Sequence, residues 1–252
     1  MNVDLKLRNA GRVGDQARRV ELATAFAALG DPTRLGILQA ISLQDLSPDA
    51  LAAELGISGN LLAHHLKVLQ QAGLIHRNHS QHDRRRSYVQ SRVDDLPWLA
   101  DLLGERAELK APRVVFVCTH NSARSVLAEA LWREVSAVPT SSAGTAPAAS
   151  VHPRARRVAR SLGLPMRTRR PAHLDEVLRS GDVVVSVCDA VNEELPSMPN
   201  HRLHWSIADP SAIDTDRAFR AAAEQLRHRV ERLAASVSPA ADNRRDQGRS
   251  DE

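Results

Sequence analysis

The residues of this sequence best suited to chemistry are a cysteine and an arginine six positions apart, Cys118 and Arg124. Apolar residues 114–117 lead directly into Cys118, and a helical pattern begins after Ser125. A buried strand, a tight loop and a helix start can together hold an anion, because the loop N–H groups and the helix N-terminus carry partial positive charge. The same field would favour thiolate over thiol at Cys118. Arg124 would bind a tetrahedral oxyanion through its fork of donors.

The spacing of Cys118 and Arg124 is weak evidence by itself, because the chain carries 34 Lys and Arg among 252 residues. The context strengthens it: a strand precedes the loop, and an Asp209-Pro210 pair follows far downstream. Asp209 is a candidate general acid that would protonate a departing oxygen. The alternative for Asp209 is a helix cap, since a helix is expected from about residue 214.

Two segments carry a family resemblance, Cys-Thr-His-Asn-Ser-Ala-Arg-Ser at 118–125 and Trp-Ser-Ile-Ala-Asp-Pro-Ser at 205–211. They resemble the low-molecular-weight protein tyrosine phosphatase superfamily, and within it the thiol-dependent arsenate reductases, over about 112–237. The resemblance implies that Cys118 is the nucleophile and that Ser125 donates to its thiolate. It also implies an oxyanion-binding loop made of Thr119, His120, Asn121, Ser122 and Ala123, in which Asn121 fixes the loop conformation.

The second cysteine, Cys188, distinguishes an arsenate reductase from a phosphatase. It could simply be a buried structural cysteine. However, Val-Ser-Val-Cys-Asp-Ala at 185–190 is similar to the strand-end cysteine of the thiol-dependent arsenate reductases. The resemblance then implies that Cys188 attacks the thiol–arsenic adduct, releases arsenite and leaves a disulfide. Thioredoxin-coupled relatives carry a further cysteine where this chain has Leu195, so we expect mycothiol, glutathione or a redoxin to reduce the bond directly.

Other positions bear on the alternatives. Tyrosine phosphatases carry a second loop cysteine where this chain has Ala123, and aromatic residues where it has Ser211 and Ala212. Both differences disfavour phosphotyrosine as a substrate. A phosphatase-like hydrolase and a non-catalytic repressor that senses oxyanions or redox state remain alternatives. Asn121 and Glu129 also match the spacing of a potassium site found in some relatives, although no tightly bound cofactor is expected.

The first part of the chain reads as helices near 17–29, 31–41, 48–55 and 58–72. Asp31-Pro32, Ser47-Pro48 and Ser58 are the start signals, and Leu22, Phe26 and Leu29 should share one face of the first helix. A short helix, a glycine turn and a longer helix form the helix-turn-helix pattern. Two strands, 74–79 and 86–90, should follow around a basic tip. This hairpin could be a wing that meets DNA phosphates, or simply a solvated hairpin.

This region resembles the winged-helix repressors of the ArsR family, on Ala-Ala-Leu-Gly-Asp-Pro-Thr-Arg-Leu-Gly-Ile-Leu at 27–38 and Ala-His-His-Leu-Lys-Val-Leu-Gln-Gln-Ala-Gly-Leu at 63–74. The resemblance implies a homodimer on a near-palindromic operator. The expected DNA contacts are Ser58, Asn60, His64, His65, Lys67, Arg84, Arg85 and Arg86. This domain has no cysteine for a thiolate metal sensor. His64 and His65 are no metal pair, since neighbouring helix residues point about 100° apart.

The chain after residue 112 alternates strands, near 113–118, 138–142, 182–188 and 202–206, with helices near 123–136, 152–162, 173–180, 190–195 and 214–236. This pattern predicts an α/β domain with a four-stranded parallel sheet, which follows the mainly-α winged helix-turn-helix. The family resemblance implies that this domain has the low-molecular-weight phosphatase-like fold. Cys118 and Cys188 should meet at the carboxyl ends of the strands. We expect a flexible segment 1–16, a DNA-binding domain 17–103 ending in a helix from 93, a linker 104–112, the α/β domain 113–237 and a disordered tail 238–252.

Composition sets the remaining expectations. The chain has 42% hydrophobic residues, a net charge of +4 and two cysteines. It has no apolar run long enough for a membrane span and no signal segment, so a cytoplasmic protein with reduced thiols is expected. The two resemblances together imply a DNA-binding regulator of arsenical resistance fused to a thiol-dependent arsenate reductase, with operator DNA, arsenate or phosphate and a thiol donor as partners.

Overall fold

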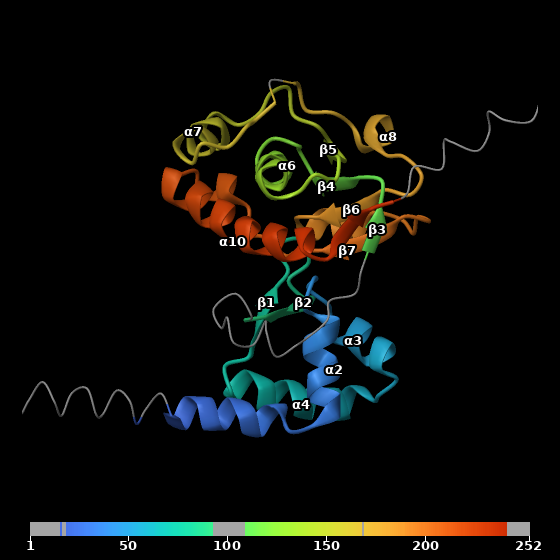
Figure 1. Cartoon of the computed structure of the whole chain (residues 1–252), viewed down its shortest axis with the longest axis vertical. Coiled ribbons are helices and arrows are strands. Elements are labelled where there is room, and N and C mark those ends of the chain that lie inside the picture. Colours follow the sequence, from blue (N-terminus) through green and yellow to red (C-terminus); the bar gives the residue numbers. More distant parts are fainter. Residues whose placement is uncertain (1–15, 17–18, 93–108, 168, 241–252) are drawn as a thin grey trace, which may run out of the picture. The chain divides into compact units, whose positions relative to one another are not determined.

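The computed structural model describes residues 16, 19–92, 109–167 and 169–240 (Figure 1). The chain divides into two compact units, the first formed by residues 1–79 and 86–104 and the second by residues 80–85 and 105–252. The expected helix at 93–103 and most of the expected linker, 104–108, lie outside the described residues. So do most of the expected flexible segment 1–16 and residues 241–252 of the expected tail.

The first unit begins with a helix over 19–29 and continues with α2 (Pro32–Ala40), α3 (Pro48–Leu55) and α4 (Gly59–Gln71). The predicted caps hold each N-terminus. Asp31 accepts from the backbone N–H of residue 34, Ser47 from that of residue 50, and Ser58 from that of residue 61. Gly56 ends α3 with a φ of 63°, a left-handed conformation that glycine adopts without strain.

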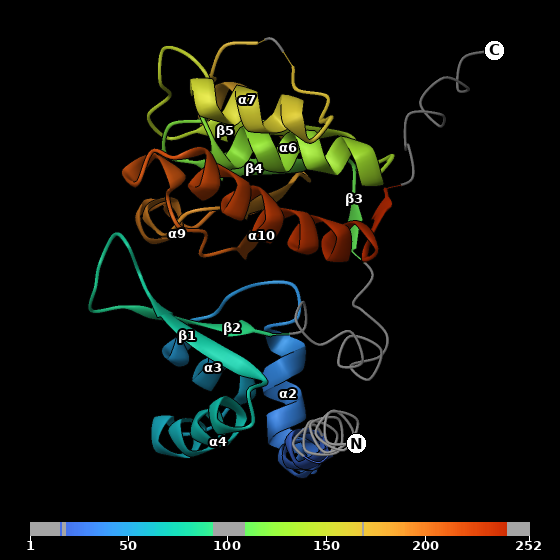
Figure 2. The same ribbon diagram turned by 90° about the vertical axis from the view of Figure 1, so that its left-hand side faces the viewer.

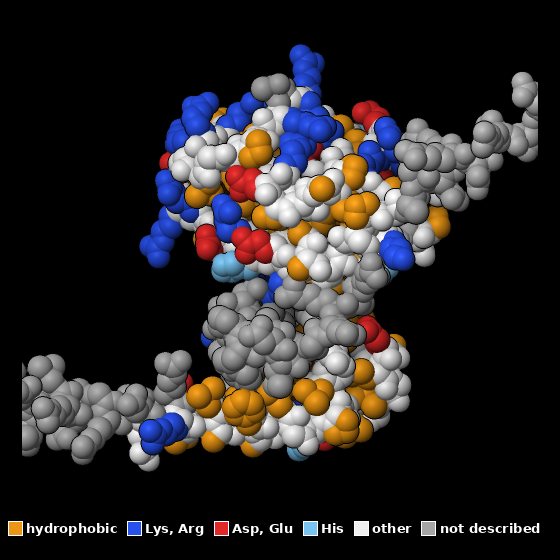
Figure 3. Space-filling view, in the orientation of Figure 1, with side chains coloured by type: hydrophobic (Ala, Val, Ile, Leu, Met, Phe, Trp, Pro, Cys, Tyr) orange, Lys and Arg blue, Asp and Glu red, His pale blue; other side chains and the backbone are white. Residues whose placement is uncertain are grey.

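The core of the first unit is aliphatic and is formed by buried residues of all four helices, among them Leu29, Ile37, Leu38, Leu51, Leu62, Leu66 and Leu69. The apolar face expected for the first helix is only partly buried. Leu29 is buried, but Phe26 is 54% exposed, because Ala25 and Ala28 turn toward the core instead. Figure 3 shows hydrophobic side chains at the surface of this unit.

The expected hairpin is present as β1 (Ile75–His79) and β2 (Ser87–Ser91), which pair antiparallel with Arg77 opposite Val89. A single bridge between Leu46 and Val89 joins β2 to the segment before α3. Val89 is fully buried, so it fixes the face that the hairpin turns to the helices.

The second unit contains a four-stranded parallel sheet in the order β5-β4-β6-β7, as expected. The strands are β4 (Val114–Cys118), β5 (Thr140–Gly144), β6 (Val183–Ser186) and β7 (His201–His204). Every residue of β4, β5 and β6 is buried, and β4 and the first three residues of β6 are apolar, as expected for strands covered on both faces. Because all four strands run the same way, their carboxyl ends lie along one edge, and Cys118 ends β4 there.

Helices flank this sheet. They are α6 (Arg124–Val135), α7 (Pro153–Ser161), α8 (Leu174–Val177), α9 (Asp189–Glu194) and α10 (Asp216–Ala234), with a short 3-10 turn, η2 (Pro210–Ala212). Helices α6, α7 and α10 pack side by side (Figure 2), while α9 contacts β4 and β6. None of the helices in the described part of the chain is long and apolar enough to cross a membrane.

Two short strands correct the expected boundaries of this unit. β3 (Leu109–Ala111) pairs in parallel with β8 (Val237–Pro239), whereas residues 109–111 were expected in the linker and residues 238–239 in the tail. Nearby, Arg113 forms a bidentate ion pair with the buried carboxylate of Asp182, at 3.0 and 2.6 Å. The pair joins the start of β4 to the start of β6.

Candidate active site

The thiol of Cys118 lies at the end of β4 and is buried, 3% exposed. Its Sγ is 3.1 Å from the Oγ of Ser125, which is the second residue of α6. The loop between these two residues therefore folds back, so that the start of α6 lies beside the Cys118 sulfur. The arrangement of strand, loop and helix start that the sequence predicted is confirmed.

Peptide geometry determines where the loop N–H groups point. The carbonyls of Thr119, His120 and Ser122 accept hydrogen bonds from the backbone of residues 146, 148 and 152. The described residues contain no cis peptide bond, so each following N–H points away from that outer segment. Within the described part of the chain, these N–H groups have no protein acceptor. These N–H groups are donors that a bound anion could use.

Asn121 holds the loop in a strained conformation. Its φ is 46°, a region that asparagine tolerates better than most residues, and it is 1% exposed. Its Oδ1 accepts from the N–H of Ala172 at 3.0 Å, and its Nδ2 donates to the Oγ of Ser125 at 2.9 Å. Because that amide occupies one side of the Ser125 oxygen, the serine O–H is left to donate to Cys118.

Arg124 connects the loop to the Asp209 segment. Its guanidinium is buried and donates from Nη1 to the carbonyl of Ile207 at 3.0 Å and from Nη2 to Oδ2 of Asp209 at 2.8 Å. Asp209 also caps η2, accepting from the N–H of Ser211 at 2.9 Å. The Asp209 carboxylate thus caps η2 and faces the arginine of the loop, whereas Thr215 caps the long helix α10 that Asp209 was considered to cap. The role of Asp209 as general acid stays a prediction.

Cys188 directly precedes α9, just beyond the end of β6, and is 2% exposed. Its Sγ lies 3.7 Å from the Oγ1 of Thr119, the residue after Cys118. Burial raises the pKa of the Cys188 thiol, and the nearby Cys118 raises it further, while Arg124 lowers it. Both cysteines are free thiols on adjacent strand ends.

One buried pair beside Cys188 was missed by the sequence analysis. Oδ1 of Asp189 is 3.2 Å from Nε2 of His204, and both side chains are almost fully buried. The His204 Nδ1 lies 3.1 Å from Oγ of Ser186. Burial would raise the pKa of the Asp189 carboxyl, but hydrogen bonds, led by that of His204, hold it below its usual value. An acidic residue directly after Cys188 was the available signal.

Comparison with known families agrees with this geometry. Residues 113–243, just over half of the chain, match the family model of the low molecular weight phosphotyrosine protein phosphatase. The chain belongs to this family. Residues 29–78 match a helix-turn-helix domain model. The predicted fusion of a helix-turn-helix domain with a low-molecular-weight phosphatase-like domain is therefore confirmed.

Relatives of the phosphatase-like half include proteins named arsenate reductase. One from Brevibacillus brevis is 29% identical over 126 residues, which cover 48% of this chain and 92% of the relative. The structure of an arsenate reductase from Archaeoglobus fulgidus is 31% identical, covers 48% of this chain and 98% of that chain, and has a TM-score of 0.44. That of a thioredoxin-dependent arsenate reductase from Corynebacterium glutamicum is 27% identical, with a TM-score of 0.42, covering 50% of this chain and 62% of that chain.

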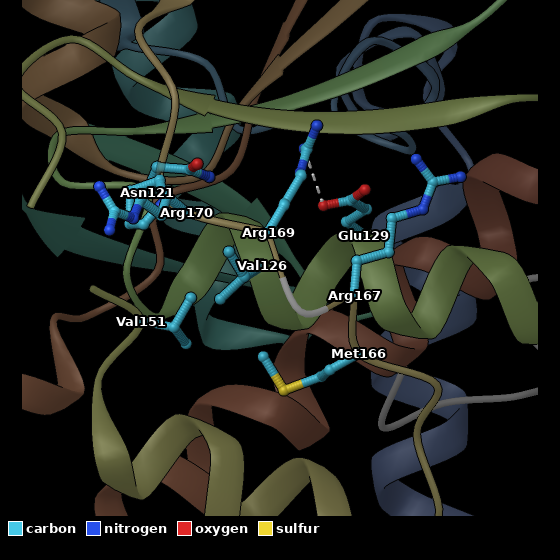
Figure 4. A pocket seen from close by; sticks show the side chains of 9 residues that line it. Asn121, Val126, Glu129, Val151, Met166, Arg167, Arg169 and Arg170 are labelled. Atoms are coloured by element: carbon cyan, nitrogen blue, oxygen red, sulfur yellow. Dashed lines mark hydrogen bonds and ion pairs between the residues drawn. The ribbon is translucent and has the colours of Figure 1, made fainter. Parts of the chain in front are cut away.

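The residues considered for potassium do not fit a bound metal ion. Asn121 uses its side chain on Ser125 and Ala172. The buried carboxylate of Glu129 is paired with two arginines, Arg133 and Arg169. Figure 4 shows the Arg169 and Glu129 side chains pointing toward one another, with Asn121 and Arg170 on the other side of the pocket. An arginine guanidinium therefore lies where such a cation would meet Glu129.

The expected DNA contacts divide into two groups. Asn60, His64 and Lys67 are exposed on α4, and the wing arginines 84–86 are exposed as well. His65 was expected among the contacts but is 7% exposed, and its Nδ1 lies 3.8 Å from Asp31, so its ring faces the protein. Ser58 uses its hydroxyl to cap α4. In the wing, Arg85 is paired with Asp83 at 3.0 Å.

Proposed function

We propose that the phosphatase-like unit is an arsenate reductase and that the helix-turn-helix unit is a DNA-binding regulator of arsenical resistance. One observation supports the reductase over the phosphatase. The thiol of Cys188 lies beside Thr119, close enough to Cys118 for the charge of that sulfur to raise the pKa of the Cys188 thiol. Phosphate hydrolysis needs only one thiol, whereas reduction of As(V) to As(III) consumes two electrons and two thiols.

In the first step, arsenate binds against the loop N–H groups and the guanidinium of Arg124. The Cys118 thiolate attacks arsenic, a sulfur–arsenic bond forms, and one oxygen departs as water after it takes a proton from Asp209. An oxyanion on Arg124 competes with the Asp209 carboxylate for the same guanidinium. Substrate binding therefore loosens the Arg124–Asp209 pair and frees Asp209 to act as the acid.

In the second step, the thiolate of Cys188 attacks the sulfur of Cys118. A Cys118–Cys188 disulfide forms, and the electron pair of the sulfur–arsenic bond stays on arsenic, which leaves as arsenite. An external thiol donor, such as mycothiol, glutathione or a redoxin, then returns both cysteines to thiols. The relative from Corynebacterium glutamicum is named thioredoxin-dependent, which supports a thiol donor.

The decisive experiment mixes purified protein with arsenate and candidate thiols and measures arsenite release. Mass spectrometry should find a Cys118–Cys188 disulfide after arsenate treatment. The Cys118→Ser variant should lose both signals, and unchanged arsenite release in that variant would rule out the mechanism. Rapid hydrolysis of p-nitrophenyl phosphate without arsenite release would instead favour the phosphatase.

For the DNA-binding unit, the exposed side chains of Asn60, His64 and Lys67 on α4 are the proposed operator contacts, made by a homodimer. A non-catalytic role as an oxyanion- or redox-sensing repressor has one observation in its favour. Both cysteines of the chain, Cys118 and Cys188, lie in the phosphatase-like unit. Under that alternative, arsenate, arsenite or oxidant would change operator binding without measurable turnover.

A further inference from the structure

The carboxylate of Glu129 lies on α6, one helical turn beyond Ser125, and is 3% exposed. A buried carboxylate needs a counter-charge and donors for its oxygens. Arg133 pairs with one oxygen, and the hydroxyl of Ser142 donates to the other. The Nη2 of Arg169 lies 3.2 Å from that second oxygen.

Arg169 lies in a set of oxygen atoms. Besides Glu129, its guanidinium donates to the carbonyl of Ser142 at 2.7 Å, to the Oγ of Ser142 at 3.2 Å and to the Oγ of Ser141 at 3.1 Å. A carboxylate, a carbonyl and hydroxyls are also the ligands that hard metal cations prefer. In this chain the guanidinium of Arg169 occupies the position that a metal cation would take among these oxygen atoms.

The positive charges around Glu129 already balance its carboxylate, so a further cation is not needed there. Three arginines, Arg133, Arg167 and Arg169, lie near this single carboxylate. Burial lowers the pKa of Arg133, and the positive charges of Arg167 and Arg169 lower it further, while Glu129 raises it. An added metal ion would meet this positive field as well as an occupied carboxylate.

Arg169 is also the first anchor of a segment that reaches the catalytic loop. Three residues later, the carbonyl of Ala172 accepts from the N–H of Gly144 at 2.9 Å, at the end of β5. The N–H of Ala172 donates to Oδ1 of Asn121. A backbone N–H only donates, so this bond fixes which way the Asn121 amide faces and directs its Nδ2 toward Ser125.

We propose that Arg169 is a built-in cation that replaces a bound metal ion beside Glu129 and, through Ala172 and Asn121, orients the Ser125 hydroxyl toward the Cys118 sulfur. Arg169 is a positioning residue and does not contact the reacting atoms. Without it, the segment 169–172 loses its bonds to β5 at residues 141 and 142. The Asn121 amide is then free to turn, and the thiolate loses an oriented donor.

The test is the rate at which iodoacetamide alkylates Cys118 at neutral pH, measured in a Cys188→Ser background so that one thiol reports. The inference rests on the proposed nucleophilic role of Cys118, but alkylation needs no arsenate. A failure of arsenate reduction and a failure of this inference are therefore distinguishable. In Arg169→Ala we expect the alkylation rate to fall about tenfold, the size of one lost hydrogen bond to a charged group.

Arg170→Ala is the matched control, because Arg170 lines the same pocket and carries the same charge but has no hydrogen bond or ion pair to the described residues. It should alkylate at the rate of the parent protein. The parent rate should be equal in potassium, sodium and tetramethylammonium chloride. In Arg169→Ala, potassium or millimolar guanidinium should restore part of the lost rate, and tetramethylammonium should not.

Three results would overturn the proposal: an unchanged rate in Arg169→Ala, an equal loss in Arg170→Ala, or a parent protein whose rate depends on potassium. Circular dichroism and urea unfolding report whether Arg169→Ala folds. If it does not, Arg169→Lys decides, since it keeps the charge but not the fork of donors. It should lose part of the rate and remain independent of potassium, and a potassium-dependent Arg169→Lys would contradict the proposal.

Discussion

Replacing Gly144 by alanine tests how closely the end of β5 must approach the catalytic loop. A Cβ at this position would lie 2.6 Å from the carbonyl oxygen of Thr119, 2.9 Å from the backbone N of Asn121 and 3.1 Å from the Cβ of Asn121. Ordinary contact begins at 3.4 Å, so the loop must retreat from residue 144 by about 0.8 Å (3.4 − 2.6). The atoms that have to move belong to the backbone of the oxyanion-binding loop.

Two magnitudes follow from that displacement. Overpacking of this kind costs about 1–3 kcal/mol of unfolding free energy. A shift of roughly 1 Å in a catalytic group costs up to about 100-fold in rate, because the reacting atoms leave their attack geometry. We therefore expect Gly144→Ala to remain folded, to lose about 1–3 kcal/mol of stability, and to lose about 10- to 100-fold in kcat/KM for arsenate.

Urea unfolding measures the first quantity, and arsenite release in the presence of a thiol donor measures the second. Gly59→Ala is the control, because a Cβ there meets no atom within 4 Å. It should leave arsenate reduction unchanged. A Gly144→Ala protein with normal kcat/KM would refute the reasoning, since it would mean that the loop tolerates the displacement or that its position does not limit the reaction.

Three further outcomes are expected. Cys188→Ser should stop disulfide formation and multiple turnover. In the unmutated protein, the rate of disulfide formation should rise with pH toward and beyond 9, because burial and Cys118 raise the pKa of Cys188 above its ordinary value of 9.0. A rate that does not change with pH would contradict this. Asp182→Ala leaves Arg113 without its partner and should cost about 3–5 kcal/mol in urea unfolding, whereas a loss below about 1 kcal/mol would show that water replaces the carboxylate. Asn60→Ala should weaken operator binding by at least about fivefold in a gel-shift assay, because a lost base contact costs at least about 1 kcal/mol. Unchanged binding would remove Asn60 from the contact set.

Much of the fold was predictable because it rests on local bonds. Asp31, Ser47 and Ser58 cap the helices that begin directly after them, and those bonds span only three residues. The apolar runs ending at Cys118 and near Cys188 also predicted adjacent parallel strands from local sequence alone. A continuous apolar run is typical of a strand that is buried on both faces of a parallel sheet. The thiol loop was predictable through the same strand end and the helix that follows it.

What the sequence could not predict depends on pairing between distant residues. Nothing near Arg169 indicates that its partners are Glu129, 40 residues earlier, and the two serines of β5. The pairing of β3 with β8 joins segments more than 120 residues apart, and each strand has three residues, too few to show a periodic pattern. The exposure of Phe26 was missed because a helical pattern defines a face but not which neighbouring element covers it.

In the proposed chemistry, access to the Cys118–Cys188 disulfide past α9 determines which reductant can act on it. A disulfide between Cys118 and Cys188 would join two side chains that are 3% and 2% exposed, so no protein surface could reach it without movement. The loop of Cys118 is held by Asn121 and by the backbone of residues 146–152, whereas α9 has only six residues and its capping residue, Cys188, makes no side-chain cap bond. The next residue, Asp189, is paired with His204. We expect a small thiol to need a smaller opening around Cys188 than a redoxin does, because Leu195 leaves no third thiol to carry the disulfide outward.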